Sequence, residues 1–276
     1  CGGRADAETG VDSSASSSAS FTTTTAGSDV LRPSQILTES ASVNDYVIAI
    51  RRELHRNPEL MRSERYTSSV IKRERHAMRI THKDVAAPGV VGIIGNGMAP
   101  VVLLRADMDA LPLTEETDVG NFPEHLRSQK TGLMHACGHD AHTTMLLGAA
   151  KHLAKTRNFA GTAVLIFQPA EEGLGGARTM IKEGLFDRFP CDEVYGMHNS
   201  PNGQLGTFGI CKGVAMAGAS FFDITIQGKG SHAAMPQQSR DPLVIASALV
   251  GSLQTILSRN VAPLDTCVLS ITQLNS

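Results

Sequence analysis

The chain has 276 residues, of which 41% are hydrophobic and 19% are charged, so it is long enough and apolar enough for a globular protein with a sizeable core. Its 25 Lys and Arg balance 27 Asp and Glu to a net charge of -2, which gives no electrostatic argument for a nucleic acid or an anionic membrane as partner. No apolar run approaches the ~18 residues that indicate a membrane span. We therefore expect a soluble protein, with the cytoplasm as the expected compartment, although no residue identifies that compartment.

The first residues differ in character from the rest. Between Ser13 and Ser28 nearly every residue is Ser, Thr, Ala or Gly, a composition that cannot bury enough apolar surface to fold. We expect a disordered segment over residues 1–41. Because the chain opens on Cys1 rather than Met, we also expect that its natural start lies upstream.

Apolar periodicity predicts helices and strands that alternate along the chain. A helical stripe covers 43–54, and a basic stretch over 62–83 is expected to form a second, solvated helix and a connection. Further helices are expected at 140–153, with Asp140 as the N-cap, and at 177–185. The runs typical of buried strands are 90–94, 101–104, 162–167 and, more weakly, 193–196.

Strands that alternate with helices predict an α/β fold with a mostly parallel mixed sheet and flanking helices. Three of the strands run into acidic or imidazole side chains. These are the pair Asp107 and Asp109, the pair Glu171 and Glu172, and His198. Because the carboxyl ends of parallel strands meet at the same edge of a sheet, we expect these groups to converge there.

Five cysteines are spread over the chain, and no two of them form a C-x-x-C pair. This spacing argues against a disulfide framework, a redox motif and a zinc knuckle. Cys191, Cys211 and Cys267 are interpreted as small buried hydrophobic residues. Cys137 differs from them, because it lies in a dense run of reactive side chains.

That run, residues 134–142, reads M-H-A-C-G-H-D-A-H and precedes a predicted helix, where it can face the same edge of the sheet. Half of a disulfide, a structural zinc site, a cysteine nucleophile and part of a catalytic metal centre are the four interpretations. A structural zinc site requires a second Cys/His pair nearby, and none follows closely. A cysteine nucleophile would leave the paired glutamates without a role. The spacing favours metal ligation by Cys137 and His139, with a hydrogen-bonded structural cluster as the competing interpretation.

Glu171 and Glu172 are adjacent, so in an extended segment their side chains point in opposite directions and suit two roles, a metal ligand and a general base. The alternative is a loop that caps the next helix through its dipole. His198 suits either a ligand or a hydrogen-bonded core histidine. His135 and His142 are interpreted as supporting or structural, because one short segment cannot aim every imidazole at one ion.

The last part of the chain predicts a smaller β-α-β unit, with strands at 221–226 and 266–271 around a helix from Pro242 to about Leu257. After the first of these strands, the glycines of G-K-G-S-H permit a tight turn that exposes His232. This loop lacks the spacing of a phosphate-binding P-loop.

In these residues and motifs, the sequence resembles the metal-dependent amidohydrolase family of aminoacylases, hippurate hydrolases and indole-acetyl-amino-acid hydrolases. The resemblance covers roughly residues 45–276, and its several motifs in the same order make it highly specific. The matching stretches are Arg51–His55, Asn57–Leu60, Arg105–Pro112, Met134–His142, Gln168–Gly173, Gly196–Asn199 and Gly228–His232.

The resemblance implies hydrolysis of the amide bond of N-acyl or N-aroyl amino acids at a centre of two divalent metal ions. Manganese and zinc both suit the donors, and cobalt is a further candidate. Glu171 would be the general base, and Asp109 would orient a ligand imidazole. The implied metal ligands are Cys137, His139, Glu172 and His198.

The resemblance also implies a smaller lid domain that forms a homodimer. His232 would lie on this lid and help to hold the developing oxyanion, and in such enzymes it can serve the site of the neighbouring subunit. Arg259 and Asn260 resemble the lid segment that meets the substrate carboxylate. The expected organisation is a catalytic domain over 42–216 and a partial lid and dimerisation domain over 217–276.

The chain departs from the family pattern in several places. The family has a further metal-binding histidine near its C-terminus, whereas no histidine follows His232 here. Gln237 stands where relatives commonly have His, and residues 61–65 depart from the usual acidic run. We therefore expect a fragment of a longer enzyme, truncated at both ends. The alternatives are a related deacetylase or dipeptidase with the same centre, and an inactive fragment.

Overall fold

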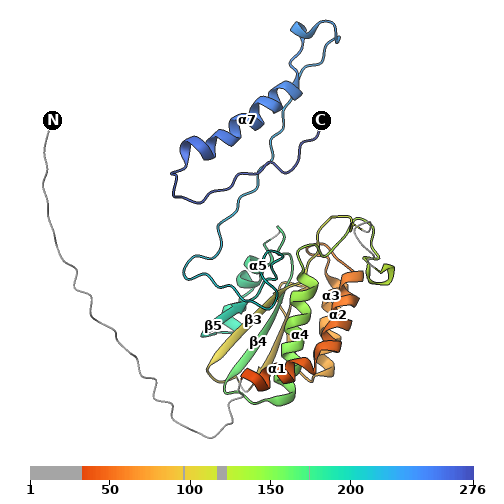
Figure 1. The fold of residues 1–276 in the computed structure, drawn as a ribbon, viewed down its shortest axis with the longest axis vertical. Helices are drawn as coiled ribbons and strands as arrows, with labels where there is room; N and C mark the ends of the chain where they lie inside the picture. The colour runs from red at the N-terminus through yellow and green to blue at the C-terminus, as the bar shows by residue number, and fades with distance from the viewer. Residues whose placement is uncertain (1–32, 96, 117–122, 174) are drawn as a thin grey trace, which may run out of the picture. The chain divides into compact units, whose positions relative to one another are not determined.

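The computed structural model describes residues 33–95, 97–116, 123–173 and 175–276 (Figure 1). Most of the predicted disordered segment 1–41 lies outside these residues. Its last part forms helix α1, Pro33–Ala41, which differs from the prediction. The chain forms two compact units that divide after Gly203, and the predicted domain boundary after residue 216 stays a prediction.

A five-stranded sheet forms the centre of the first unit, in the order β1-β2-β4-β3-β5. β2 is antiparallel to both of its neighbours, whereas β3 is parallel to β4 and to β5. One strand thus opposes the other four, which confirms the predicted mostly parallel mixed sheet. The strands are β1 Thr81–Asp84, β2 Val90–Gly95, β3 Val101–Asp107, β4 Thr162–Gln168 and β5 Glu193–Gly196.

Helices cover both faces of this sheet. On one face, α2 (Asn44–Arg56), α3 (Arg65–Ala77) and α4 (His139–Thr156) pack together, as Figure 1 shows. The short helices α5 (Gly176–Lys182) and α6 (Leu185–Arg188) contribute Met180 and Leu185 to a second core with the other face. The first unit is therefore an α/β/α sandwich.

The central strand β4 has a continuous apolar sequence because it packs into both cores. All of its residues are buried. Leu165 and Phe167 belong to the core under α2 to α4, whereas Val164 and Ile166 belong to the opposite core. Because successive side chains of a strand point to opposite faces, a strand covered on both faces has no polar positions to alternate with.

Three local features of this unit differ from the prediction. The basic stretch does form the predicted helix, α3, but only one face of it is solvated, because it buries Thr67, Val70 and Ile71, and the chain then enters β1. β1 was missed because its sequence, T-H-K-D, belongs to a mostly exposed edge strand and carries no apolar alternation. In addition, α4 begins at His139 behind a left-handed Gly138 at φ +85°, and Asp140 is not its N-cap.

The second unit holds a short 3-10 helix, Pro236–Gln238, and helix α7, Pro242–Asn260. The helix after Asp241 is confirmed, since the Asp241 side chain accepts the backbone N–H of Leu243 at 2.8 Å and caps it. The predicted strands at 221–226 and 266–271 are not formed. A strand needs a hydrogen-bonded neighbour, and in the described unit the backbone bridge joins only Lys229 and Arg240.

Most of the apolar surface of this unit is exposed. α7 buries only Ala246, although it is apolar and long enough, by length and composition alone, to cross a membrane. One such helix is weak evidence for a membrane span. Cys211 and Cys267 are also exposed, so their interpretation as buried residues was wrong, whereas Cys191 is half-buried against the second core.

We predict that replacement of Leu54 by Ala lowers the free energy of unfolding by about 2–5 kcal/mol, because a fully buried side chain of α2 leaves a cavity. Ile48→Ala in the same helix is the control, since its side chain is 37% exposed and its loss should cost less than about 1 kcal/mol. Urea unfolding measures both. Equal losses would show that the core is not where the structure places it.

Candidate metal centre

The carboxyl ends of β3, β4 and β5 lie level at one edge of the sheet. Asp107, the last residue of β3, is opposite Gln168, the last residue of β4. Arg105 of β3 is opposite Gly196, the last residue of β5. The predicted acidic and imidazole residues follow these strand ends within a few positions, and the structure brings their side chains together there, as expected for an open α/β sheet.

His139 lies at the centre of this group. Its side chain is fully buried, and neither ring nitrogen has a hydrogen-bond partner among the described residues. Nε2 lies 3.7 Å from Oε1 of Glu172 and 4.0 Å from Oε2 of Glu171, and Nδ1 lies 3.4 Å from Oδ1 of Asp109. Burial opposes protonation of His139, but Asp109 and the other carboxylates outweigh it and raise its pKa.

Cys137 and His198 complete the group from two different segments. The Cys137 Sγ lies 3.3 Å from Nε2 of His198. Nδ1 of His198 lies 2.7 Å from the backbone oxygen of Asn199, so a proton on Nδ1 leaves the Nε2 lone pair facing the thiol. Burial and the nearby charge of Glu172 raise the pKa of the Cys137 thiol to about 12. A divalent cation beside the sulfur would reverse this balance and favour the thiolate.

His139 belongs to three groups of possible metal ligands, and within each group the donor atoms lie within 4.8 Å of one another. The first contains Cys137 and His198, and the second contains Glu171 and Glu172, so the structure gathers every predicted ligand and the predicted base. The third contains Asp107, which the sequence analysis expected at this edge, and His142, which it interpreted as supporting or structural. His142 lies one helical turn after His139, and this spacing was the signal that could have placed it among the donors.

Asp107 and His142 are engaged with each other and with neighbouring residues. His142 Nδ1 lies 2.6 Å from Oδ1 of Asp107, and Nη1 of Arg105 donates to Oδ2 of Asp107 at 2.7 Å. Burial opposes ionisation of Asp107, but His142 and Arg105 outweigh it and lower the pKa to about 2. On its other side, His142 Nε2 accepts the backbone N–H of Asn199 at 3.0 Å. This network holds the segment that carries His198.

Asp109 binds the backbone of the glutamate pair. Its Oδ1 accepts the N–H of Glu171 at 2.9 Å, and its Oδ2 accepts the N–H of Glu172 at 3.0 Å. The same carboxylate faces Nδ1 of His139. Asp109 is therefore placed to orient both the imidazole and the loop, which is more than the sequence predicted for it.

A second buried cluster supports the start of α4. His55 is buried, with Nδ1 2.8 Å from Oδ2 of Asp140 and Nε2 2.9 Å from Oε1 of Glu115. Arg51 Nε forms an ion pair with the same oxygen of Asp140 at 2.9 Å. These contacts tie α2 to the first turn of α4, where His139 lies.

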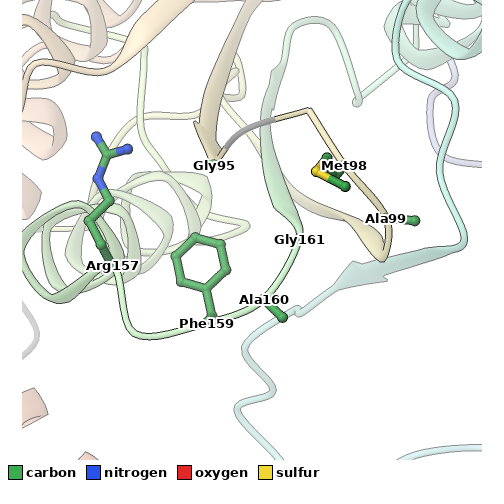
Figure 2. Close-up of a pocket in the computed structure, with 7 residues that line it drawn as sticks. All are labelled: Gly95, Met98, Ala99, Arg157, Phe159, Ala160 and Gly161. Atoms are coloured by element: carbon green, nitrogen blue, oxygen red, sulfur yellow. The ribbon is translucent and has the colours of Figure 1, made fainter. Parts of the chain in front are cut away.

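Two other features lie outside the cluster. An open hollow of about 480 Å³, shown in Figure 2, lies near the residues that precede β3 and β4, at the opposite ends of those strands, and Arg157 is the charged residue among its described lining residues. His232 belongs to the second unit, where it lies in an exposed loop and its Nδ1 accepts the N–H of Ala234 at 3.1 Å.

Comparison with known proteins gives a family match over residues 103–271, to a model described as peptidase family M20/M25/M40. An IAA-amino acid hydrolase, ILR1-like 2, of Arabidopsis thaliana is 46% identical over 239 residues, which are 86% of this chain and 53% of that protein. The hippurate hydrolase of Campylobacter jejuni is 44% identical over 229 residues, 82% of this chain and 58% of that protein. The chain thus spans little more than half the length of these relatives.

A solved structure supports the same relationship. The YXEP protein of Bacillus subtilis, described as a dinuclear metal-binding peptidase of the M20 family, matches with a TM-score of 0.53 and 38% identity. The match covers 59% of this chain and 45% of that one. The fold therefore agrees with that of a protein described as binding two metal ions.

We predict that Gly138→Ala destabilises the chain by at least ~1 kcal/mol more than Gly132→Ala. Both glycines have a positive φ, so each alanine strains the backbone by ~1–2 kcal/mol. Only at Gly138 would the new Cβ lie 2.5 Å from the Asn199 side chain, whereas nothing lies within 4 Å at Gly132. Urea unfolding of the two variants compares them, and equal losses would show that Asn199 is not held against this turn.

Proposed function

Because the chain belongs to peptidase family M20/M25/M40, we propose that the protein that carries it hydrolyses the amide bond of N-acyl or N-aroyl amino acids at a two-metal centre. The observation that supports this most directly is the set of thiol, imidazole and carboxylate donors gathered around the buried His139. The names of the similar proteins support amino-acid amides as the class of substrate. The acyl group and the amino acid are left open.

The hydrogen bonding of these side chains also fits bound metal, independently of the similar proteins. Both ring nitrogens of His139 and Oε1 of Glu172 are buried and lack a hydrogen-bond partner among the described residues. A buried polar atom without a partner costs about 1–3 kcal/mol, more when the group is charged. A divalent cation between Nε2 of His139 and Oε1 of Glu172, which lie 3.7 Å apart, would satisfy both atoms, whereas Nδ1 faces Asp109 at 3.4 Å. Thiolate and imidazole favour zinc, and carboxylates accept manganese or cobalt, so the donor set supports each of the three ions.

We assign Cys137, His139, Glu172 and His198 as the residues that hold the metal ions. When bound, the ions would polarise the scissile carbonyl and acidify water at neutral pH. Glu171 then takes the proton of the attacking water and delivers it to the leaving amine. Its side chain is 35% exposed against 17% for Glu172, which fits a group that exchanges protons with solvent and substrate.

The second unit is proposed as part of a lid and dimerisation domain. Its helix α7 leaves Leu243, Val244 and Ile256 exposed, which fits a surface that another subunit covers. His232 is proposed to help hold the developing oxyanion, and a homodimer is proposed with it. These assignments apply to the whole protein, because the similar proteins are longer than this chain.

We predict that Cys137→Ser weakens binding of Mn²⁺ or Zn²⁺ by at least ~10-fold, because even the loss of a residue outside the ligand set costs ~10–100-fold. Cys191→Ser is the matched control, since Cys191 is also a half-buried free cysteine of the first unit but lies outside the donor groups. Elemental analysis and metal titration of the purified chain measure both. Unchanged binding in Cys137→Ser would remove Cys137 from the ligand set.

We predict that Glu171→Gln lowers turnover by about 10²–10⁴-fold, because the general base is lost, while metal stays bound. Glu172→Gln should instead lower metal content first. Release of the amino acid from a panel of N-acetyl and N-benzoyl amino acids measures turnover. A wild-type protein that binds metal but cleaves none of these amides contradicts the proposed function, and normal turnover in Glu171→Gln contradicts the assignment of the base.

A further inference from the structure

The glutamate pair is carried by a short, strained loop. Ala170, directly before Glu171, is fully buried and has a left-handed backbone with φ +51°, which is unfavourable for a residue with a Cβ. The loop then turns back so closely that a Cβ at Gly176 would lie 1.6 Å from the oxygen of Pro169. Such a conformation persists only where the surroundings hold it in place.

Two buried carboxylates hold this loop through three successive backbone N–H groups. Asp109 accepts the N–H groups of Glu171 and Glu172, as described above. The N–H of Ala170 donates to Oε1 of Glu64 at 2.7 Å. The oxygen of Ala170 accepts the N–H of Gly176 at 2.9 Å, so the Ala170 residue is fixed on both sides.

Glu64, the partner of Ala170, is a buried carboxylate from a distant part of the sequence. It directly precedes α3, far from Ala170 in the sequence, and its side chain is fully buried. Its Oε2 has no hydrogen-bond partner among the described residues. Burial raises the pKa of Glu64, and the charge of Asp109 adds to this rise although backbone hydrogen bonds oppose it. A protonated carboxyl still offers Oε1 as an acceptor, so the contact with Ala170 needs no charge on Glu64.

We propose that Glu64 is a positioning residue, which fixes the backbone at Ala170 and so aims the Glu171 and Glu172 carboxylates at His139. The inference rests on the proposed function for its catalytic consequence, but the positioning itself does not. Glu64 lies outside the donor groups around His139, so it acts through the loop and touches neither substrate nor metal. Metal affinity and turnover therefore depend on a side chain that is remote from both.

Three variants of the 276-residue chain test this. Glu64→Met keeps the volume and removes the acceptor, whereas Glu64→Gln keeps an acceptor oxygen and resembles the protonated carboxyl. Glu59→Met is the matched control for stability. Glu59 is also a buried carboxylate from the segment before α3, but it accepts the N–H groups of Tyr66 and Thr67 in the first turn of that helix, both at 2.9 Å, and among the described residues its side chain makes no hydrogen bond to the loop.

The first measurement is amide hydrogen exchange of the metal-free chains, each compared with its own global unfolding. In Glu64→Met we expect exchange at Ala170, Glu171 and Glu172 to rise on the order of 10-fold or more. Glu64→Gln should restore protection at these amides, and Glu59→Met should release only Tyr66 and Thr67. Unchanged protection at residues 170–172 in Glu64→Met overturns the proposal.

The second measurement is affinity for Mn²⁺, which does not depend on any substrate. We expect Glu64→Met to bind Mn²⁺ about 10–100-fold more weakly, with recovery in Glu64→Gln. An equal loss in Glu59→Met would mean that both residues act only through stability, and would overturn the positioning role. A wild-type chain that binds Mn²⁺ but cleaves no amide refutes the proposed function alone, because the loop and its metal affinity are measured separately.

Discussion

The buried imidazole of His139 is the constraint on which the rest of the site depends. Its ring nitrogens have no hydrogen-bond partner among the described residues, yet carboxylates face it from several directions. So many acidic groups in a buried space repel one another unless cations compensate them. Arg105 does this for Asp107 through a direct hydrogen bond. Among the described residues, the carboxylates of Asp109, Glu171 and Glu172 form no ion pair with an arginine or a lysine, and this imbalance is the physical argument for bound metal.

This arrangement arises because the parallel strands of the fold end close together at one edge of the sheet. β3 and β4 end opposite each other and β5 ends opposite Arg105, near the end of β3, so the residues that follow these strands share one edge, and α4 begins at the same place. Contacts behind the donors then fix their directions. Asp109 and Glu64 hold the loop of the paired glutamates, and His142 holds the segment of His198 through Asn199. Residues outside the donor groups thus hold the backbone segments that carry the donor side chains.

The two units contribute differently to this picture. The first has a sandwich with two cores and contains every donor group around His139. The second has one long helix that buries only Ala246, and it carries His232 on an exposed loop. Hydrophobic burial is therefore the main stabilising force of the first unit, whereas the second leaves most of its apolar surface exposed.

The sequence alone determined the strands that are buried on both faces, the helices α2 to α5 and α7, and the gathering of Cys137, His139, the glutamate pair and His198. Apolar runs and strand-end motifs are local signals, so they can be read without neighbours. Only the tertiary structure decided the edge strand β1, the missing strands of the second unit, the burial of His55 and Glu64, and the network of Asp107 with His142. Each of these depends on a partner far away in the chain, such as Ala170 for Glu64. The local sequence does not predict such pairings, because the hydrogen bonds and the burial of a side chain depend on its neighbours in three dimensions.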